Sequence, residues 1–203
     1  MFKKKYTLAA IVLFTSLSSC LAHASAGDEE ANASLPQKTV NVDTYYLPIA
    51  DPYILLYKDK YYAYGTGTIE VDKGFTVYSS VDLKCWKEEG RALSAVNSYG
   101  TWGFWAPEVY YVEAQKKFYM FYSSSEHICV ATSDSPTGPF RQDAKQPIWD
   151  EKSIDSSLFI DEDGTPYLYF VRFTNGNVIW VAEMEPDLKG IKKETLKECI
   201  VAE

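Results

Sequence analysis

The sequence predicts an all-β protein, and three observations lead to that prediction. Of the 203 residues, 46% are hydrophobic and 15% aromatic, which is enough apolar material to form a buried core. From about Val42 onward, short runs of aromatic and β-branched residues alternate with turn signals. No long stretch has the 3.6-residue periodicity of a helix. These features exclude a disordered or collagen-like chain.

The first 19 residues are expected to be an export signal. Three lysines at positions 3–5 precede an apolar run, residues 7–19, that is too short for a membrane-spanning helix. The end of the signal has two interpretations. Residues 17–20 resemble a bacterial lipobox, in which Cys20 would be lipidated, whereas the small residues at 22–26 resemble ordinary cleavage sites. We favour the lipobox because Cys20 directly ends the apolar run.

A polar, partly acidic tether is expected over residues 20–41. Together these segments predict an exported protein, either a periplasmic or outer-membrane lipoprotein or a secreted protein. Contact with a membrane is expected only through a lipid on Cys20.

The first hairpin is expected to begin at Asp51. Residues 51–57 and 60–64 are rich in tyrosine and aliphatic side chains, and the polar sequence Lys58-Asp59-Lys60 between them predicts a turn. A further strand-like block begins at Val77.

This unit recurs twice along the chain. The second hairpin is expected over residues 106–122, with a turn at 113–116, and the third over residues 155–170, with Asp163-Gly164 in its turn. Blocks beginning at Val130 and Val181 follow them. The hairpin starts are 55 and 49 residues apart, and the blocks 53 and 51. A period near fifty is typical of a β-propeller, in which four-stranded sheets cover one another's faces. A β-sandwich is the competing architecture, but it does not require this order to repeat three times.

The charge and the cysteines narrow the possible partners. The chain has 28 acidic and 20 basic residues, a net charge of −8, and no cluster of lysine and arginine in its body, so nucleic acid is not expected as a partner. After Cys20 only Cys85, Cys129 and Cys199 remain, without the spacing of a zinc site or of a disulfide framework. One disulfide and buried thiols both fit, and we favour buried thiols.

Asp51 and Asp155 are the candidate catalytic residues. Both open their repeats, while Ala106 stands at that place in the second repeat. In a propeller the first strand of each sheet runs near the central axis, so these positions should converge. Two carboxylates in one pocket shift each other's pKa and can divide acid and base work. An aspartate before a proline, as at Asp51, is also a common turn starter, and it is the matched positions that favour catalysis.

Four motifs in order resemble glycoside hydrolase family 43. They are Asp51-Pro52 with its strand, Gly103-Phe-Trp-Ala-Pro-Glu108, the block Val130 to Phe140, and the segment Ile154 to Gly164. The resemblance covers roughly residues 48–185. It implies a five-bladed β-propeller, of which residues 42–203 would form about three blades. It also implies inverting hydrolysis of glycans derived from arabinan, arabinoxylan or xylan.

The resemblance assigns roles to individual residues. Asp51 matches the family's general base, and Asp155 matches the residue that orients the general acid and raises its pKa. An inverting glycosidase holds its two catalytic carboxyl groups roughly 6.5–9.5 Å apart, so that a water fits between one of them and the sugar. Gly103, Phe104 and Trp105 match a segment that approaches the substrate, where aromatic faces suit stacking on a sugar ring. In an aromatic-rich propeller, such rings also fill the space between blades.

One departure from the family affects activity. The family's general acid is a glutamate in a Glu-Gly-Pro-like motif at the start of the next blade, and no Glu-Gly-Pro occurs in the 203 residues. The chain is therefore expected to be the N-terminal portion of an enzyme, with little or no activity by itself. The alternative is a non-catalytic glycan-binding fragment or a pseudogene remnant.

No metal site or cofactor is expected within this chain. Residues 161–163 are acidic but lack the spacing of a calcium loop, and they are better interpreted as a hairpin turn. A structural cation, where the family has one, is held by residues of later blades.

Overall fold

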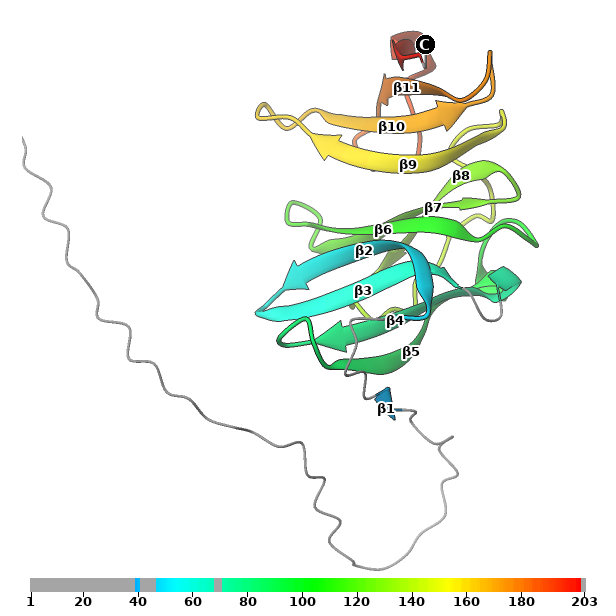
Figure 1. Ribbon diagram of the computed structural model, residues 1–203. Helices are drawn as coiled ribbons and strands as arrows, with labels where there is room; N and C mark the ends of the chain where they lie inside the picture. The colour runs from blue at the N-terminus through cyan, green and yellow to red at the C-terminus, as the bar shows by residue number, and fades with distance from the viewer. Residues whose placement is uncertain (1–38, 41–46, 68–70, 202–203) are drawn as a thin grey trace, which may run out of the picture. The chain divides into compact units, whose positions relative to one another are not determined.

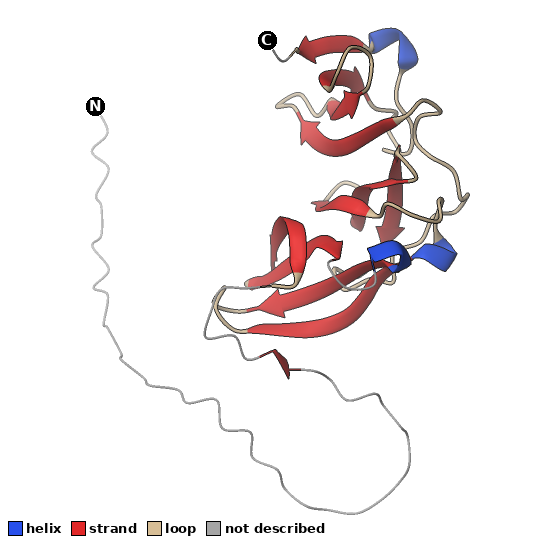
Figure 2. Cartoon of the chain, turned by 45° about the vertical axis from the view of Figure 1, so that its right-hand side comes forward, coloured by secondary structure: helices blue, strands red, loops and turns tan. Residues whose placement is uncertain are grey.

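The fold is all-β, as predicted (Figure 1). The computed structural model describes residues 39–40, 47–67 and 71–201. The strands are β1 (Thr39–Val40), β2 (Ile49–Tyr57), β3 (Lys60–Gly67), β4 (Gly74–Ser80), β5 (Trp86–Ser94), β6 (Trp105–Val112), β7 (Lys117–Ser124), β8 (His127–Ser133), β9 (Ser153–Ile160), β10 (Pro166–Arg172), β11 (Val178–Glu183) and β12 (Lys197–Ile200). Helical structure in the described residues is limited to the short 3-10 turns η1 (Val71–Lys73), η2 (Ala95–Asn97) and η3 (Lys193–Thr195) (Figure 2).

The predicted export signal and Cys20 lie outside the described residues. In the part of the chain that is described, no helix has the length and apolar character needed to cross a membrane. Within the segment predicted as a tether, Thr39 and Val40 form β1, which pairs with β5 at Lys87 and Trp86.

The strands form three antiparallel sheets, each made from consecutive strands. The first sheet has the order β1-β5-β4-β3-β2, the second β6-β7-β8, and the third β12-β11-β10-β9. Strands β2, β6 and β9 each begin a repeat and lie at one edge of their sheet, and β6 contacts both β2 and β9. The second sheet has three strands, and a bridge between Thr132 and Arg141 stands where a fourth would run.

The turns inside the hairpins follow the residue types that predicted them. Lys58 and Asp59 both have positive φ, of 49° and 61°, as a tight type I′ hairpin turn requires. In the third hairpin Gly164 has φ of 87°, and its N–H donates to the carbonyl of Asp161 at 2.9 Å. Glycine reaches this conformation at no steric cost. The acidic residues 161–163 therefore form the hairpin turn that the sequence predicts.

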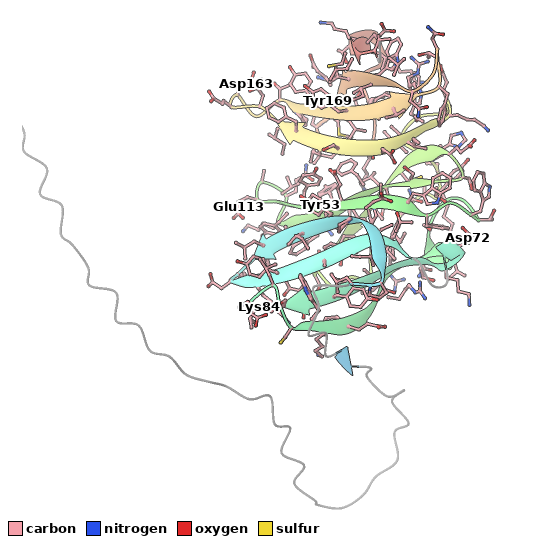
Figure 3. All side chains as sticks on the ribbon, viewed as in Figure 1. Tyr53, Asp72, Lys84, Glu113, Asp163 and Tyr169 are labelled. Carbon is pink, nitrogen blue, oxygen red and sulfur yellow. The ribbon has the colours of Figure 1, made fainter. Side chains whose placement is uncertain are left out.

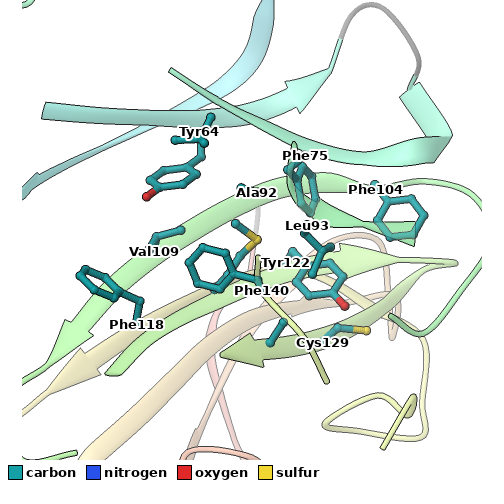
Figure 4. Close-up of a cluster of buried hydrophobic side chains, with 13 residues drawn as sticks. Tyr64, Phe75, Ala92, Leu93, Phe104, Val109, Phe118, Tyr122, Cys129 and Phe140 are labelled. Carbon is teal, nitrogen blue, oxygen red and sulfur yellow. The ribbon is translucent and has the colours of Figure 1, made fainter. Parts of the chain in front are cut away.

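Apolar side chains fill the space between successive sheets. The cluster between the first and second sheets includes Tyr64, Phe75, Val109, Phe118 and Tyr122, all at most 2% exposed (Figure 4). A second cluster joins the second and third sheets through residues such as Phe121 and Phe170. Each buried side chain of this size contributes about 1.5–3 kcal/mol through the hydrophobic effect, so these interfaces are a main source of stability.

The far face of the third sheet carries aromatic residues that no described residue covers. The strand registers place Tyr64, Phe121 and Tyr169 at matched positions in the three sheets. Tyr64 and Phe121 are 0% exposed, because the next sheet covers each of them. Tyr169, labelled in Figure 3, instead lines an open hollow of about 440 Å³, together with Tyr167 and with Phe159, which is 51% exposed.

Candidate active site

A β-bulge interrupts the first strand of every repeat at the same place. In the first sheet, Asp51 and Pro52 lie opposite a single residue, because the pairing passes from Ala50 to Tyr53. The second sheet has the same irregularity between Trp105 and Glu108, and the third between Ile154 and Ser157. Bulges re-aim side chains and often lie next to active sites.

The residue that opens each bulge has a left-handed backbone. Asp51, Ala106 and Asp155 have φ of 46°, 42° and 54°, a conformation that is uncommon for residues other than glycine. Such residues cost of order 1–3 kcal/mol each and persist only where the surrounding structure holds them. The two predicted catalytic residues therefore share one unusual conformation, although they are far apart in the sequence.

The hydroxyl groups of Thr66 and Ser123 hold these bulges. The Thr66 hydroxyl donates to Asp51 Oδ2 at 2.7 Å and accepts from the N–H of Ala106 at 2.9 Å. The Ser123 hydroxyl accepts from the N–H of Asp155 at 3.0 Å. Each hydroxyl thus joins a bulge to the sheet before it.

The charge of Asp51 acts on the carboxyl group of Asp155. Burial raises the pKa of the Asp155 carboxyl above its usual range, and the negative charge of Asp51 raises it further. Both side chains remain accessible to solvent. These carboxyl groups lie two repeats apart in the chain, on β2 and β9, the two strands that both contact β6.

Trp102 and Trp105 form an aromatic surface next to Gly103, and Trp105 directly precedes the bulge at Ala106. Gly103 has φ of 63°, its N–H donates to Asp72 Oδ1 at 2.7 Å, and a Cβ at this position would lie 3.0 Å from the Trp105 ring. Only glycine allows this approach without strain. The Trp105 ring meets the ring of Trp102 edge to face at 5.6 Å, and Trp102 is 43% exposed.

Phe104 does not belong to this surface. Its side chain is 1% exposed, and its ring packs 5.9 Å from Phe75 and 6.2 Å from Tyr122 in the cluster between the first two sheets (Figure 4). The predicted role of Phe104 in substrate contact is therefore corrected, because a buried ring offers no face to a sugar.

A polar cluster lies below the bulges on the inner strands. The Tyr110 hydroxyl donates to the Glu108 carboxylate and lies 3.4 Å from Ser157 Oγ, while the rings of Tyr110 and Tyr53 are 5.5 Å apart. Burial raises the pKa of Tyr110, and its hydrogen bond to Glu108 adds to the effect. Tyr110 therefore keeps its proton and ties β6 to β9.

The comparison with known families identifies the chain. A model described as glycosyl hydrolases family 43 matches residues 47–202, which include strands β2 to β12 and both bulge aspartates. The chain belongs to this family.

Members of family 43 resemble this chain in sequence and in structure. The crystal structure of an endo-1,4-beta-xylanase from Bacteroides thetaiotaomicron is 72% identical with a TM-score of 0.77, covering 80% of this chain and 56% of that one. An endo-arabinase from the same species is 31% identical with a TM-score of 0.67, covering 76% of this chain and 56% of that one. A beta-xylosidase of Xylanibacter ruminicola is 38% identical over 92 residues, which is 43% of this chain and 27% of that enzyme. The chain thus spans about half the length of these structures and less of the xylosidase.

Some residues around the bulges and Gly103 were not predicted from the sequence. Thr66 and Ser123 hold the bulges, Asp72 holds Gly103, and Trp102 extends the aromatic surface. Thr66 and Ser123 do have a sequence signal, since each lies one or two residues beyond the aromatic run of a second strand. Within the described residues, no group of three or more His, Cys, Asp or Glu could hold a metal ion.

Proposed function

We propose that this chain is part of an exported glycosidase that hydrolyses xylan- or arabinan-type polysaccharides with inversion. Asp51 acts as the general base that activates water. Asp155 raises the pKa of the general acid, Gly103 and Trp105 shape the sugar site, and five blades form the complete propeller. Xylan is the first substrate to test, because the 72% identical structure carries the name endo-1,4-beta-xylanase.

The observation that carries this proposal is that Asp51 and Asp155 occupy the same position in the bulges of two different repeats. Both carboxylates stand at the same position of a bulge, on residues with positive φ, and strained residues of this kind cluster at active sites. Burial raises the pKa of Asp155, and the negative charge of Asp51 raises it further. In an inverting enzyme, a carboxylate so placed keeps a neighbouring acid protonated by like-charge repulsion.

The proposal also explains which step this chain performs alone. The 203 residues contain no Glu-Gly-Pro motif, so the general acid that protonates the leaving group is supplied from outside them. Glycosides with poor leaving groups need that proton, whereas a 2,4-dinitrophenyl glycoside does not, because its phenolate is already a stable anion. The base alone should therefore act on the activated substrate.

The test compares two kinds of substrate on the purified chain. We expect slow release of dinitrophenol from 2,4-dinitrophenyl β-xyloside or α-arabinofuranoside, and no detectable cleavage of xylo- or arabino-oligosaccharides. Asp51→Asn should abolish the release, while Glu162→Gln, which removes an exposed carboxylate in the third hairpin turn, should leave it unchanged. Equal release by the wild type and Asp51→Asn would reject the role of Asp51.

A glycan-binding function without catalysis is the second candidate. The exposed Trp102 ring and the half-buried Trp105 ring favour it, because such rings can stack on sugars without any catalytic group. It predicts calorimetric binding of xylo- or arabino-oligosaccharides that Trp102→Ala weakens, with no dinitrophenol release from any variant.

Lipidation of Cys20 is proposed as the membrane attachment. The supporting observation is the lipobox-like residues 17–20. Export itself is supported by an extracellular endo-alpha-(1->5)-L-arabinanase of Bacillus subtilis that is 30% identical over 145 residues. Cys20→Ala should move the protein from the membrane fraction to the soluble fraction. An unchanged distribution would favour cleavage at residues 22–26 instead.

A further inference from the structure

The Thr66 hydroxyl has a fixed direction. A threonine hydroxyl has one proton to donate and two lone pairs that accept. The N–H of Ala106 can only donate, so it occupies a lone pair of Thr66 Oγ1 at 2.9 Å. The hydroxyl proton is then available for Asp51 Oδ2 at 2.7 Å. One side chain thus links the carboxylate of the first sheet to the backbone of the second.

Ser123 occupies the position in the second sheet that Thr66 occupies in the first, and it makes one of the two hydrogen bonds that Thr66 makes. Thr66 pairs with Ala50 and Ser123 pairs with Trp105, in each case the residue directly before the bulge. The Ser123 hydroxyl accepts from the N–H of Asp155, as Thr66 does from that of Ala106. The bulge of the second sheet opens with Ala106, which has no carboxylate for Ser123 to bind. Of Thr66 and Ser123, only Thr66 therefore has a bulge carboxylate in its own sheet.

We infer that Thr66 is a positioning residue that holds the Asp51 carboxylate at a set place relative to Asp155, and that Ser123 sets the backbone of Asp155. This inference rests on the function proposed for the two aspartates. Its physical basis is repulsion between like charges. A carboxylate without its hydroxyl partner rotates away from a neighbouring carboxylate, whereas one that accepts a hydrogen bond from Thr66 keeps its place.

A merely structural role for Thr66 makes a different prediction. If the hydroxyl only joined two sheets, its loss would destabilise them and leave the interaction between the aspartates unchanged. The titration of Asp155 separates the two cases. Burial and the Asp51 charge are the causes of its raised pKa, so that pKa reports where the Asp51 charge lies.

The experiment follows the carboxyl carbon of Asp155 by ¹³C NMR as the pH is changed. The variants are Thr66→Val, Thr66→Ser, Asp51→Asn and the double variant Asp51→Asn/Thr66→Val, with Thr66→Ala as a second variant that lacks the hydroxyl. Thr195→Val is the matched control. The Thr195 hydroxyl also accepts a backbone N–H, that of Glu183 at 2.9 Å, and donates to the Lys192 carbonyl at 2.7 Å, but it lies in η3 and bonds no bulge residue among these contacts.

We expect Thr66→Val to lower the titration midpoint of Asp155 by at least half of the shift that Asp51→Asn produces. Thr66→Ser should keep the wild-type midpoint, and Thr195→Val should not move it. The double variant should match Asp51→Asn, because Thr66 acts only through that carboxylate. The inference is overturned if Thr66→Val and Thr66→Ala both titrate as the wild type does, or if Thr66→Val still shifts Asp155 in the Asp51→Asn background.

The titration also distinguishes this inference from the proposed function. It requires no turnover, so a chain that hydrolyses nothing can still show that Thr66 positions Asp51. Conversely, dinitrophenol release that depends on Asp51, together with an unchanged Asp155 titration in Thr66→Val, removes the role of Thr66 alone.

Discussion

Replacing Phe104 with alanine tests whether this ring supports the core or the sugar site. Its side chain is 1% exposed and packs against Phe75 and Tyr122. Truncating a buried phenylalanine costs about 3–5 kcal/mol, and the loss of two ring pairs favours the upper part of that range. With a urea m-value of about 2 kcal/mol/M for a domain of this size, the unfolding midpoint should fall by about 1.5–2.5 M.

The assay is urea unfolding followed by tryptophan fluorescence, with Trp102→Ala as the control. Trp102 is 43% exposed, so its removal should lower the free energy of unfolding by less than about 1 kcal/mol. Our placement of Phe104 in the core is refuted if Phe104→Ala unfolds within about 0.3 M of the wild type. Weakened sugar binding in such a stable variant would restore its predicted role in substrate contact.

Three further changes test other parts of the structure. Gly103→Ala should cost about 1–2 kcal/mol and alter Trp105 fluorescence, because the new Cβ meets the indole ring at a positive φ; an unchanged emission spectrum would argue against this packing. The raised pKa of Asp155 means that its protonated form favours the folded state, so this contribution is complete below the ordinary aspartate pKa and is lost as the pH rises through the folded pKa. Asp155→Asn should therefore raise the melting temperature at neutral pH and lose this advantage near pH 3, where an advantage independent of pH would contradict the assignment. Tyr169→Lys should reduce the binding of an apolar dye without lowering stability, whereas Phe121→Lys at the matched buried position should prevent folding. If the two variants had equal effects, the sheet face around Tyr169 would be covered as the face around Phe121 is.

Local sequence features predicted the hairpins well, because their turns depend on residues close in the chain. Lys58-Asp59 and Gly164 have the positive φ that their turn positions require. The three repeats were also predicted, since each contains its own pattern of aromatic residues and turn signals. Matched positions then drew attention to Asp51 and Asp155 without any knowledge of the bulges.

The bulges themselves could not be predicted, because their stability comes from another sheet. Nothing about an alanine indicates a φ of 42°, yet Ala106 adopts it with its N–H bonded to Thr66. Sequence distance conceals such a contact. Phe104 was misjudged for a related reason: an aromatic residue beside a glycine fits a core or a binding surface equally well until the direction of the chain after Gly103 is known.

The way in which each sheet is covered has a consequence for synthesis on the ribosome. The aromatic face around Tyr64 is buried by the second sheet, and the face around Phe121 by the third. Each face can therefore be buried as soon as the next repeat has been translated. About fifty more residues must emerge before a given sheet can dock its successor. Contacts between neighbouring repeats also keep loop closure local, which favours fast folding for a β-protein. Nascent chains should therefore become resistant to protease in steps of one repeat, starting from the first sheet.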